Sequence, residues 1–251
     1  MIGPTGPPRR LGRRNPVAKL GAALVFALPL LSTLDPRPAA AAIAVTLLAV
    51  PLFGVRYGQV LRRGWPLALS AVSVVVTLVP FAAERTGAPL LSVGPWVVTT
   101  GLLTTAAGLG LRIIAVALPG LVVLATVDPT DLADALVQNL RVPARFALGA
   151  LAALRLLPLL RAEWLTLTRA RRARGVAATT PAGHARAFAG TAFALLVAAI
   201  RHGTRLAVAM EARGLGRAGP RSYARRARFG AADWLLLAGA AALAAGVLQL
   251  T

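Results

Sequence analysis

The sequence predicts an all-α, polytopic membrane protein with about five transmembrane helices and a separate cytosolic module of long helices. The composition is 57% hydrophobic, with a mean hydropathy of +0.70, which is more apolar than a soluble domain of this length normally is. The apolar residues gather in long uncharged runs, and a helix satisfies its own backbone polar groups in lipid. The third observation is a net charge of +20, which the basic bias of cytosolic segments in membrane proteins explains.

Five apolar runs are the candidate transmembrane helices. They occupy residues 17–34, 38–54, 65–83, 96–127 and 231–250. The first two are close to the lower limit of about 17 residues for a span. Four arginines precede the first run and small residues 39–42 follow it, as in a secretory signal. Because the second run begins at that point, we interpret the two runs as a membrane hairpin and not as a cleaved leader.

The fourth run is unusually long and contains Arg112 and Pro119. It predicts either a kinked helix or a helix that a half-span precedes. An arginine inside a span is expected to face protein or water, and both a structural and a transport role are open for Arg112.

The distribution of basic residues predicts the orientation of the chain. With the N-terminus in the cytosol, segments 1–16, 55–64 and 128–230 hold 24 of the 28 Lys and Arg residues. The two outside loops, 35–37 and 84–95, hold only Arg37 and Arg85. This asymmetry favours a cytosolic N-terminus.

Residues 128–230 differ in kind from the runs on either side. Asp128-Pro129-Thr130-Asp131 is typical of a helix start, and Arg141-Val142-Pro143 ends that short helix. Two long helical patterns follow, Ala144–Arg174 and His184–Arg213. The first is apolar at its start and the second in its middle, and each is charged at its end and stopped by a glycine. The predicted organisation is a transmembrane region at 1–127, a cytosolic or interfacial coupling-helix module at 128–230, and a last transmembrane helix at 231–251.

The two long helices end in the same tripeptide. Ala173-Arg174-Gly175 closes the first and Ala212-Arg213-Gly214 closes the second. A glycine after a cation is ordinary helix-stop chemistry, and a chain this rich in Ala, Arg and Gly repeats such tripeptides by chance. The alternative is that each arginine is a rigid, permanently charged fork for an acidic groove on a partner, since guanidinium groups bind carboxylates with two hydrogen bonds.

The residues around both tips resemble the coupling helices of the T component of energy-coupling-factor transporters, the family of EcfT and CbiQ. The first string is Arg155-Leu-Leu-Pro158-Leu-Leu, followed by Glu163 and by Ala170-Arg-Arg-Ala-Arg-Gly175. The second, Leu206-Ala-Val-Ala-Met210-Glu211-Ala-Arg-Gly214, is the more specific. The upstream segment Thr126–Pro143 also resembles that family, so the resemblance covers roughly residues 100–250.

The resemblance implies a non-catalytic membrane scaffold in an ATP-driven importer of a micronutrient, either a vitamin or a transition-metal ion, in the bacterial cytoplasmic membrane. Its implied partners are two ABC ATPases and a substrate-binding membrane subunit (the S component), and it implies no cofactor. The implied ATPase-docking residues are Ala173, Arg174, Gly175, Ala212, Arg213 and Gly214, with Glu163, Arg171, Met210 and Glu211 in support. The first tip often ends in Ser in the family, whereas Gly175 stands here, which leaves open which ATPase each tip prefers.

Two other classes of protein are weighed against this one. A membrane enzyme of lipid or isoprenoid transfer type would need clustered acids, and Asp128, Asp131 and Asp134 on one helix face are the nearest arrangement to a Mg²⁺ site. A membrane-tethered nucleic-acid binder would use the Arg221–Arg228 cluster with Tyr223, which lipid head groups explain as well.

Several familiar motifs fail on their context. His184 and His202 have no acidic or cysteine residues at metal-ligand spacing, so no metal site is predicted. Gly214–Gly219 fits GxGxxG but follows a helix where a dinucleotide site needs a strand, and the sequence contains no P-loop and no cysteine. Glu163 and Glu211 are expected to pair with neighbouring arginines instead of acting in catalysis.

Overall fold

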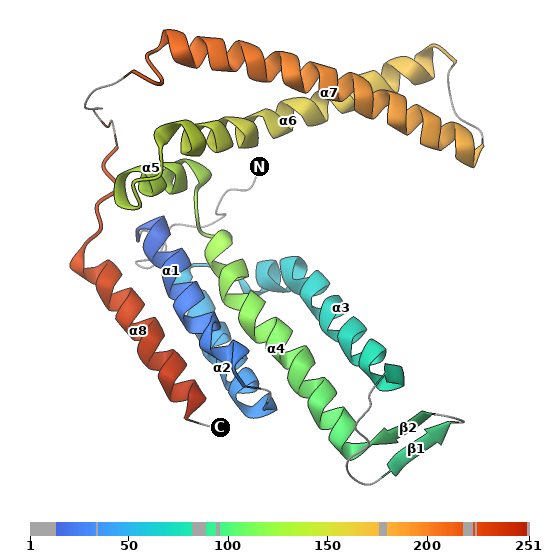
Figure 1. Cartoon of the computed structure of the whole chain (residues 1–251), viewed down its shortest axis with the longest axis vertical. Coiled ribbons are helices and arrows are strands. Elements are labelled where there is room, and N and C mark those ends of the chain that lie inside the picture. The colour runs from blue at the N-terminus through green and yellow to red at the C-terminus, as the bar shows by residue number, and fades with distance from the viewer. Residues whose placement is uncertain are drawn as a thin grey trace. The chain divides into compact units, whose positions relative to one another are not determined.

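The computed structural model describes residues 14–33, 35–81, 89–93, 96–175, 180–217, 223 and 225–249. The described chain is helical apart from one short hairpin, which confirms the all-α class and the polytopic membrane architecture (Figure 1). It divides into two compact units, one formed by residues 1–135 with 227–251 and the other by residues 136–226.

The first unit is a helical bundle. Its elements are α1 (Pro16–Ala27), η1 (Pro29–Leu31), α2 (Pro36–Ala49), η2 (Val50–Phe53), α3 (Tyr57–Phe81), α4 (Thr100–Leu124) and α8 (Ala231–Leu248). α5 (Pro129–Asn139) begins in this unit, and the long helices α6 (Ala144–Ala173) and α7 (Pro181–Ala212) belong to the second.

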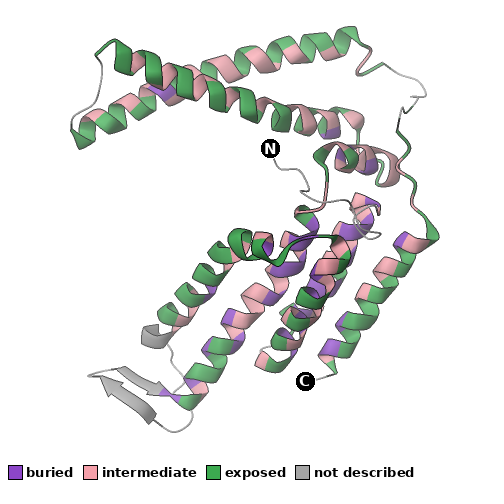
Figure 2. Ribbon diagram, turned by 180° about the vertical axis from the view of Figure 1, so that it is seen from behind, coloured by how far each residue is buried: buried purple, intermediate pink, exposed green. Residues whose placement is uncertain are grey.

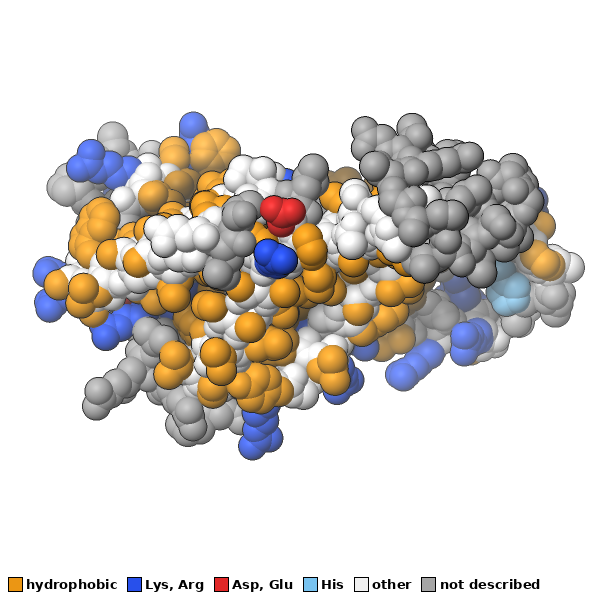
Figure 3. Space-filling view, turned by 90° about the horizontal axis from the view of Figure 1, so that it is seen from below, with side chains coloured by type: hydrophobic (Ala, Val, Ile, Leu, Met, Phe, Trp, Pro, Cys, Tyr) orange, Lys and Arg blue, Asp and Glu red, His pale blue; other side chains and the backbone are white. Residues whose placement is uncertain are grey.

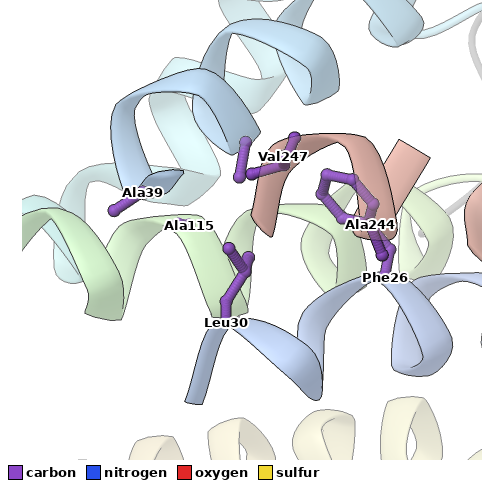
Figure 4. Close-up of a cluster of buried hydrophobic side chains, with 7 residues drawn as sticks. Phe26, Leu30, Ala39, Ala115, Ala244 and Val247 are labelled. Atoms are coloured by element: carbon purple, nitrogen blue, oxygen red, sulfur yellow. The ribbon is translucent and has the colours of Figure 1, made fainter. Parts of the chain in front are cut away.

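Small side chains let the bundle helices approach closely. One buried cluster joins α1, η1, α2, α4 and α8 through Phe26, Leu30, Ala39, Ala42, Ala115, Ala244 and Val247 (Figure 4). A Cβ added to Gly110 of α4 would lie 3.2 Å from Cγ2 of Val75 on α3, so that crossing also depends on a minimal side chain. Since lipid supplies no hydrophobic driving force between helices, such close packing is what holds a membrane bundle together.

The outer faces of the bundle are apolar as well. On α3, Leu69, Val72 and Val76 are 58%, 57% and 63% exposed. Hydrophobic side chains dominate the described part of the face seen in Figure 3, where acidic side chains are scarce. A surface of this composition is stable in lipid but not in water, which agrees with a membrane-embedded protein.

Five helical segments of the described residues are long and apolar enough to cross a membrane. They are Pro36–Phe53, Tyr57–Leu78, Thr100–Leu124, Pro181–Ala212 and Ala231–Leu248. Four of these overlap predicted spans. The predicted first span forms a shorter apolar segment, Pro16–Leu31, and the fifth candidate is α7, which we had assigned to the coupling module. By length and composition, α7 fits both a membrane span and the coupling helix that the sequence predicts.

Two element boundaries differ from the predictions. The third apolar run was predicted at 65–83, whereas α3 begins at Tyr57 and includes Arg62 and Arg63 of the basic segment 55–64. A half-span was one option for the start of the predicted run 96–127. The first residues of this run instead form the strand β2 (Trp96–Thr99), which pairs antiparallel with β1 (Pro89–Val93). The oxygen of the Thr99 side chain then accepts a hydrogen bond from Leu102 N at 3.3 Å, and this cap fixes the start of α4.

Candidate partner-docking site

Local sequence signals determine where α5 and the long helices α6 and α7 begin. Oδ1 of Asp128 accepts a hydrogen bond from Thr130 N at 2.7 Å, which confirms the predicted helix start. Arg141, with a positive φ of 54°, interrupts the helical backbone between α5 and α6. Thr180 accepts a hydrogen bond from Gly183 N at 3.1 Å and Pro181 occupies the first turn of α7. Thr followed by Pro is a common N-terminal capping sequence of helices. α7 therefore begins at Pro181, three residues before the predicted start at His184.

The two helix ends have nearly the same backbone geometry. Arg174 closes α6 with φ −83° and ψ 8°, and Arg213 closes α7 with φ −85° and ψ 9°. The next residues, Gly175 and Gly214, adopt φ of 71° and 83°, a conformation that favours glycine. At the second end, Leu215 N bonds to Met210 O and Gly214 N to Glu211 O, the Schellman pattern.

Both arginines are presented to the outside. Arg174 and Arg213 are exposed, as are Ala173 and Ala212 beside them. A cation at the C-terminal end of a helix lies at the negative end of the helix dipole, which stabilises its position. The predicted docking residues therefore form two similar cationic ends, one on each long helix.

Contacts between α6 and α7 show that the two helices are antiparallel (Figure 1). Nη1 of Arg171 donates a hydrogen bond to Ala187 O at 3.2 Å, near the end of α6 and the start of α7. The rings of Trp164 and Phe188 meet edge to face at 5.4 Å. Farther along the pair, Nε2 of His202 lies 2.7 Å from Oε1 of Glu163.

The antiparallel arrangement places the two tips at opposite ends of the pair. Arg171, one turn before Arg174, lies against Ala187 in the second turn of α7. Arg213 lies beside the first half of α6, where it lines a hollow of about 530 Å³ with Met210, Leu148 and Arg155. The segment from Ala187 to Arg213 rises about 1.5 Å per residue, so the tips are about 40 Å apart.

Double electron–electron resonance is expected to find this separation. The chain has no native cysteine, so Arg174→Cys and Arg213→Cys place the only two spin labels. We expect a distance of about 40 Å, because the tips lie at opposite ends of an antiparallel pair. A distance near 10 Å, the spacing of packed helix axes, would mean that the tips lie side by side and would contradict the arrangement.

Two of the four predicted supporting residues, Arg171 and Glu163, join α6 to α7. Arg171 binds the backbone of α7, as given above. Glu163 pairs with His202 and not with an arginine, so the expected pairing was wrong for this residue. Within the described residues Glu211 forms no ion pair; it is exposed beside the second tip. His202 was considered only as a metal ligand, and no local pattern shows that a partner 39 residues away reaches it.

The remaining candidates do not assemble into a second site. In the described part of the chain, no three His, Asp or Glu side chains come together in a group able to hold a metal ion, and this includes Asp128, Asp131 and Asp134. Gly214 and Gly216, with φ of 83° and 97°, serve to end α7.

The fold and the site thus define a polytopic helical membrane protein with a pair of long antiparallel helices that presents two arginine-capped ends. The sequence model of the cobalt transport protein family CbiQ matches residues 10–221. The chain belongs to this family, whose members are T components of cobalt and energy-coupling-factor transporters. No curated protein matches the chain.

Proposed function

We propose that this chain is the membrane scaffold and energy-coupling subunit of an ATP-driven importer for a vitamin or a transition-metal ion. In this proposal it docks two ABC ATPases and one substrate-binding membrane subunit and has no catalytic activity of its own. The observation that carries the proposal is the pair of similar arginine caps at opposite ends of one helix pair, in a chain of the CbiQ family.

Two similar cationic ends suit a partner that offers the same acidic groove twice. Arg174 and Arg213 supply planar guanidinium groups, which bind carboxylates with two hydrogen bonds and fix orientation. A dimer of ATPases presents two equivalent or related grooves that are well separated in space. Because the tips of α6 and α7 are about 40 Å apart, each can bind one groove at the same time as the other. Simultaneous binding raises the apparent affinity by avidity.

The exposed apolar side chains between the tips supply a surface for a membrane-embedded partner. Most of α6 and α7 is exposed or half-buried (Figure 2). Leu157 of α6 and Phe193 and Ile200 of α7 are 58%, 69% and 61% exposed. Large exposed apolar patches mark contacts with protein or membrane. We assign this surface to the substrate-binding subunit.

The helix pair offers a route for coupling. When the ATPases close on ATP, their two grooves move relative to one another and carry Arg174 and Arg213 with them. Because contacts such as Glu163–His202 join the helices along their length, the motion reaches the apolar surface between the tips as a rigid-body change.

The topology of this proposal follows the distribution of charge. Residues 1–127 and 231–251 form the membrane region of the bacterial cytoplasmic membrane, with a cytosolic N-terminus. Residues 128–230 form the coupling-helix module on the cytosolic side, where the ATPases and their nucleotide are found.

Purification of the tagged chain from its native membranes tests the proposal. We expect two ATPase subunits per chain and one further, strongly apolar membrane protein, identified by mass spectrometry and quantified by amino-acid analysis. ATP hydrolysis is expected in the complex and not in the chain alone. Recovery of the chain without any ATPase, from membranes in which transport of the micronutrient is active, would refute it.

A further inference from the structure

A groove in the first unit is the feature that the proposed function does not use. It has a volume of about 460 Å³, within the usual range of ligand sites, and lies between α1, α2, α4 and α8. Its walls are almost entirely apolar and include Phe26, Val45, Val123, Leu236 and Leu243.

One end of the groove is cationic. Arg14 and Lys19 line it near the start of α1, whereas Phe26 and Leu243 line it farther along the bundle. Nε of Arg14 is buried and has no hydrogen-bond partner among the residues that the structure describes. A buried donor without a partner costs free energy, so a ligand that supplies an acceptor at this point would stabilise the protein.

The acids near this end are already engaged elsewhere. The carboxylate of Asp233 accepts hydrogen bonds from Asn15 N at 3.2 Å and Gly230 N at 2.9 Å. Asp233 and Asp131 both act electrostatically on Lys19, and Nζ of Lys19 donates to Thr126 O at 3.5 Å. Within the described residues Arg14 forms no ion pair, so its charge is available to an anion from outside the chain.

An exposed cation, Arg228, also belongs to this end of the unit. Nδ2 of Asn15, the residue after Arg14, donates a hydrogen bond to the backbone oxygen of Arg228 at 3.3 Å, which brings the backbone of Arg228 close to the start of α1. Phe229 and Trp234 stack edge to face at 5.4 Å next to it, and Trp234 is 65% exposed. Exposed aromatic rings beside cations are typical of the level of the lipid head groups.

We propose that this groove binds one anionic phospholipid, with an acyl chain against the apolar walls and the phosphate at Arg14, which lines the cationic end. The residues of α8 that line the groove extend from Ala232 to Leu243, a length of about 16 Å at 1.5 Å per residue. This length suits an extended hydrocarbon chain. The apolar walls of the groove contact the acyl chain, and the cation at its other end binds the head group of the lipid. The site is independent of the ATPase-docking tips.

Two glycines of α8 provide a matched pair of variants. Gly239 lines the groove, and a Cβ added there meets nothing within 4 Å, so Gly239→Leu fills the groove without a clash at the backbone. Gly246 lies on the same helix outside the groove and is equally open at its Cβ position, so Gly246→Leu is the control.

Native mass spectrometry of the complete complex tests the proposal. The complex is reconstituted in nanodiscs with equal amounts of phosphatidylglycerol and phosphatidylcholine, and the lipids that stay bound are counted. We expect one retained phosphatidylglycerol for the wild type and for Gly246→Leu, and at least a tenfold lower occupancy for Gly239→Leu. Arg14→Gln, which keeps the groove open, is expected to retain both lipids equally.

Three results would overturn the proposal. The first is equal retention of the two lipids by the wild-type complex. The second is the same phosphatidylglycerol occupancy in Gly239→Leu as in Gly246→Leu. The third is loss of the membrane partner from Gly239→Leu with unchanged lipid, which would show that a protein segment fills the groove. Failure of the ATPases to co-purify would refute the proposed function but leaves this site intact.

Discussion

Reversing the charge at both helix ends, Arg174→Glu with Arg213→Glu, is expected to abolish co-purification of the ATPases while membrane insertion is unchanged. Truncating one partner of a hydrogen-bonded interfacial charge pair costs about 2–5 kcal/mol, and charge reversal adds repulsion from the acidic groove. Both arginines are exposed, and within the described residues neither side chain forms an ion pair or a hydrogen bond that the variant would remove. Either single variant keeps one tip and is expected to lose the avidity factor, about 10²- to 10⁴-fold.

The matched control for this experiment is Arg161→Glu with Arg205→Glu. These two arginines are also exposed, one on each long helix, and the change in net charge is the same, but neither lies at a helix end. The control complex is expected to keep its ATPases in a pull-down from detergent extract. Equal ATPase recovery from the tip variant and the control would show that the tips do not dock the ATPases.

The largest effect on stability is expected at Asp233. Its side chain is 4% exposed, and its two carboxylate oxygens hold the backbone N–H groups of Asn15 and Gly230, which joins the starts of α1 and α8. Asp233→Ala leaves both donors without a partner and removes a negative charge near Lys19. A buried donor left without a partner costs about 1–3 kcal/mol, and the Gly230 donor, which is only partly buried, costs less, so we expect a loss of about 2–4 kcal/mol in the free energy of unfolding.

Asp35→Ala provides the comparison for this measurement. Asp35 also occupies the N-cap position of a bundle helix, α2, but it is exposed and makes no side-chain cap hydrogen bond. Its replacement is expected to change the free energy of unfolding by less than about 0.5 kcal/mol. The two variants are compared by SDS titration in mixed micelles. A loss for Asp233→Ala no larger than that for Asp35→Ala would mean that the buried carboxylate does not join the two helices.

Much of the fold follows from local patterns that a sequence reveals directly. Apolar runs of span length predicted α2, α3, α4 and α8, since each pattern depends only on residues that are neighbours along one helix. The predictions were less accurate at boundaries. β2 and α3 begin where the sequence offers no strong capping signal, and the apolar run 96–127 does not by itself distinguish a strand from the first turns of a helix.

The sequence by itself determined the class of protein, the long helices and the two arginine ends, because hydropathy, helix stops and short motifs are local properties. Only the tertiary structure decided that α6 and α7 run antiparallel, so that Arg174 and Arg213 point to opposite ends of the pair. It also decided that Glu163 meets His202, and that α1, α2, α4 and α8 enclose a groove with Arg14 at its end. These features depend on side chains that are distant along the chain, and their packing has no periodic signal within one segment.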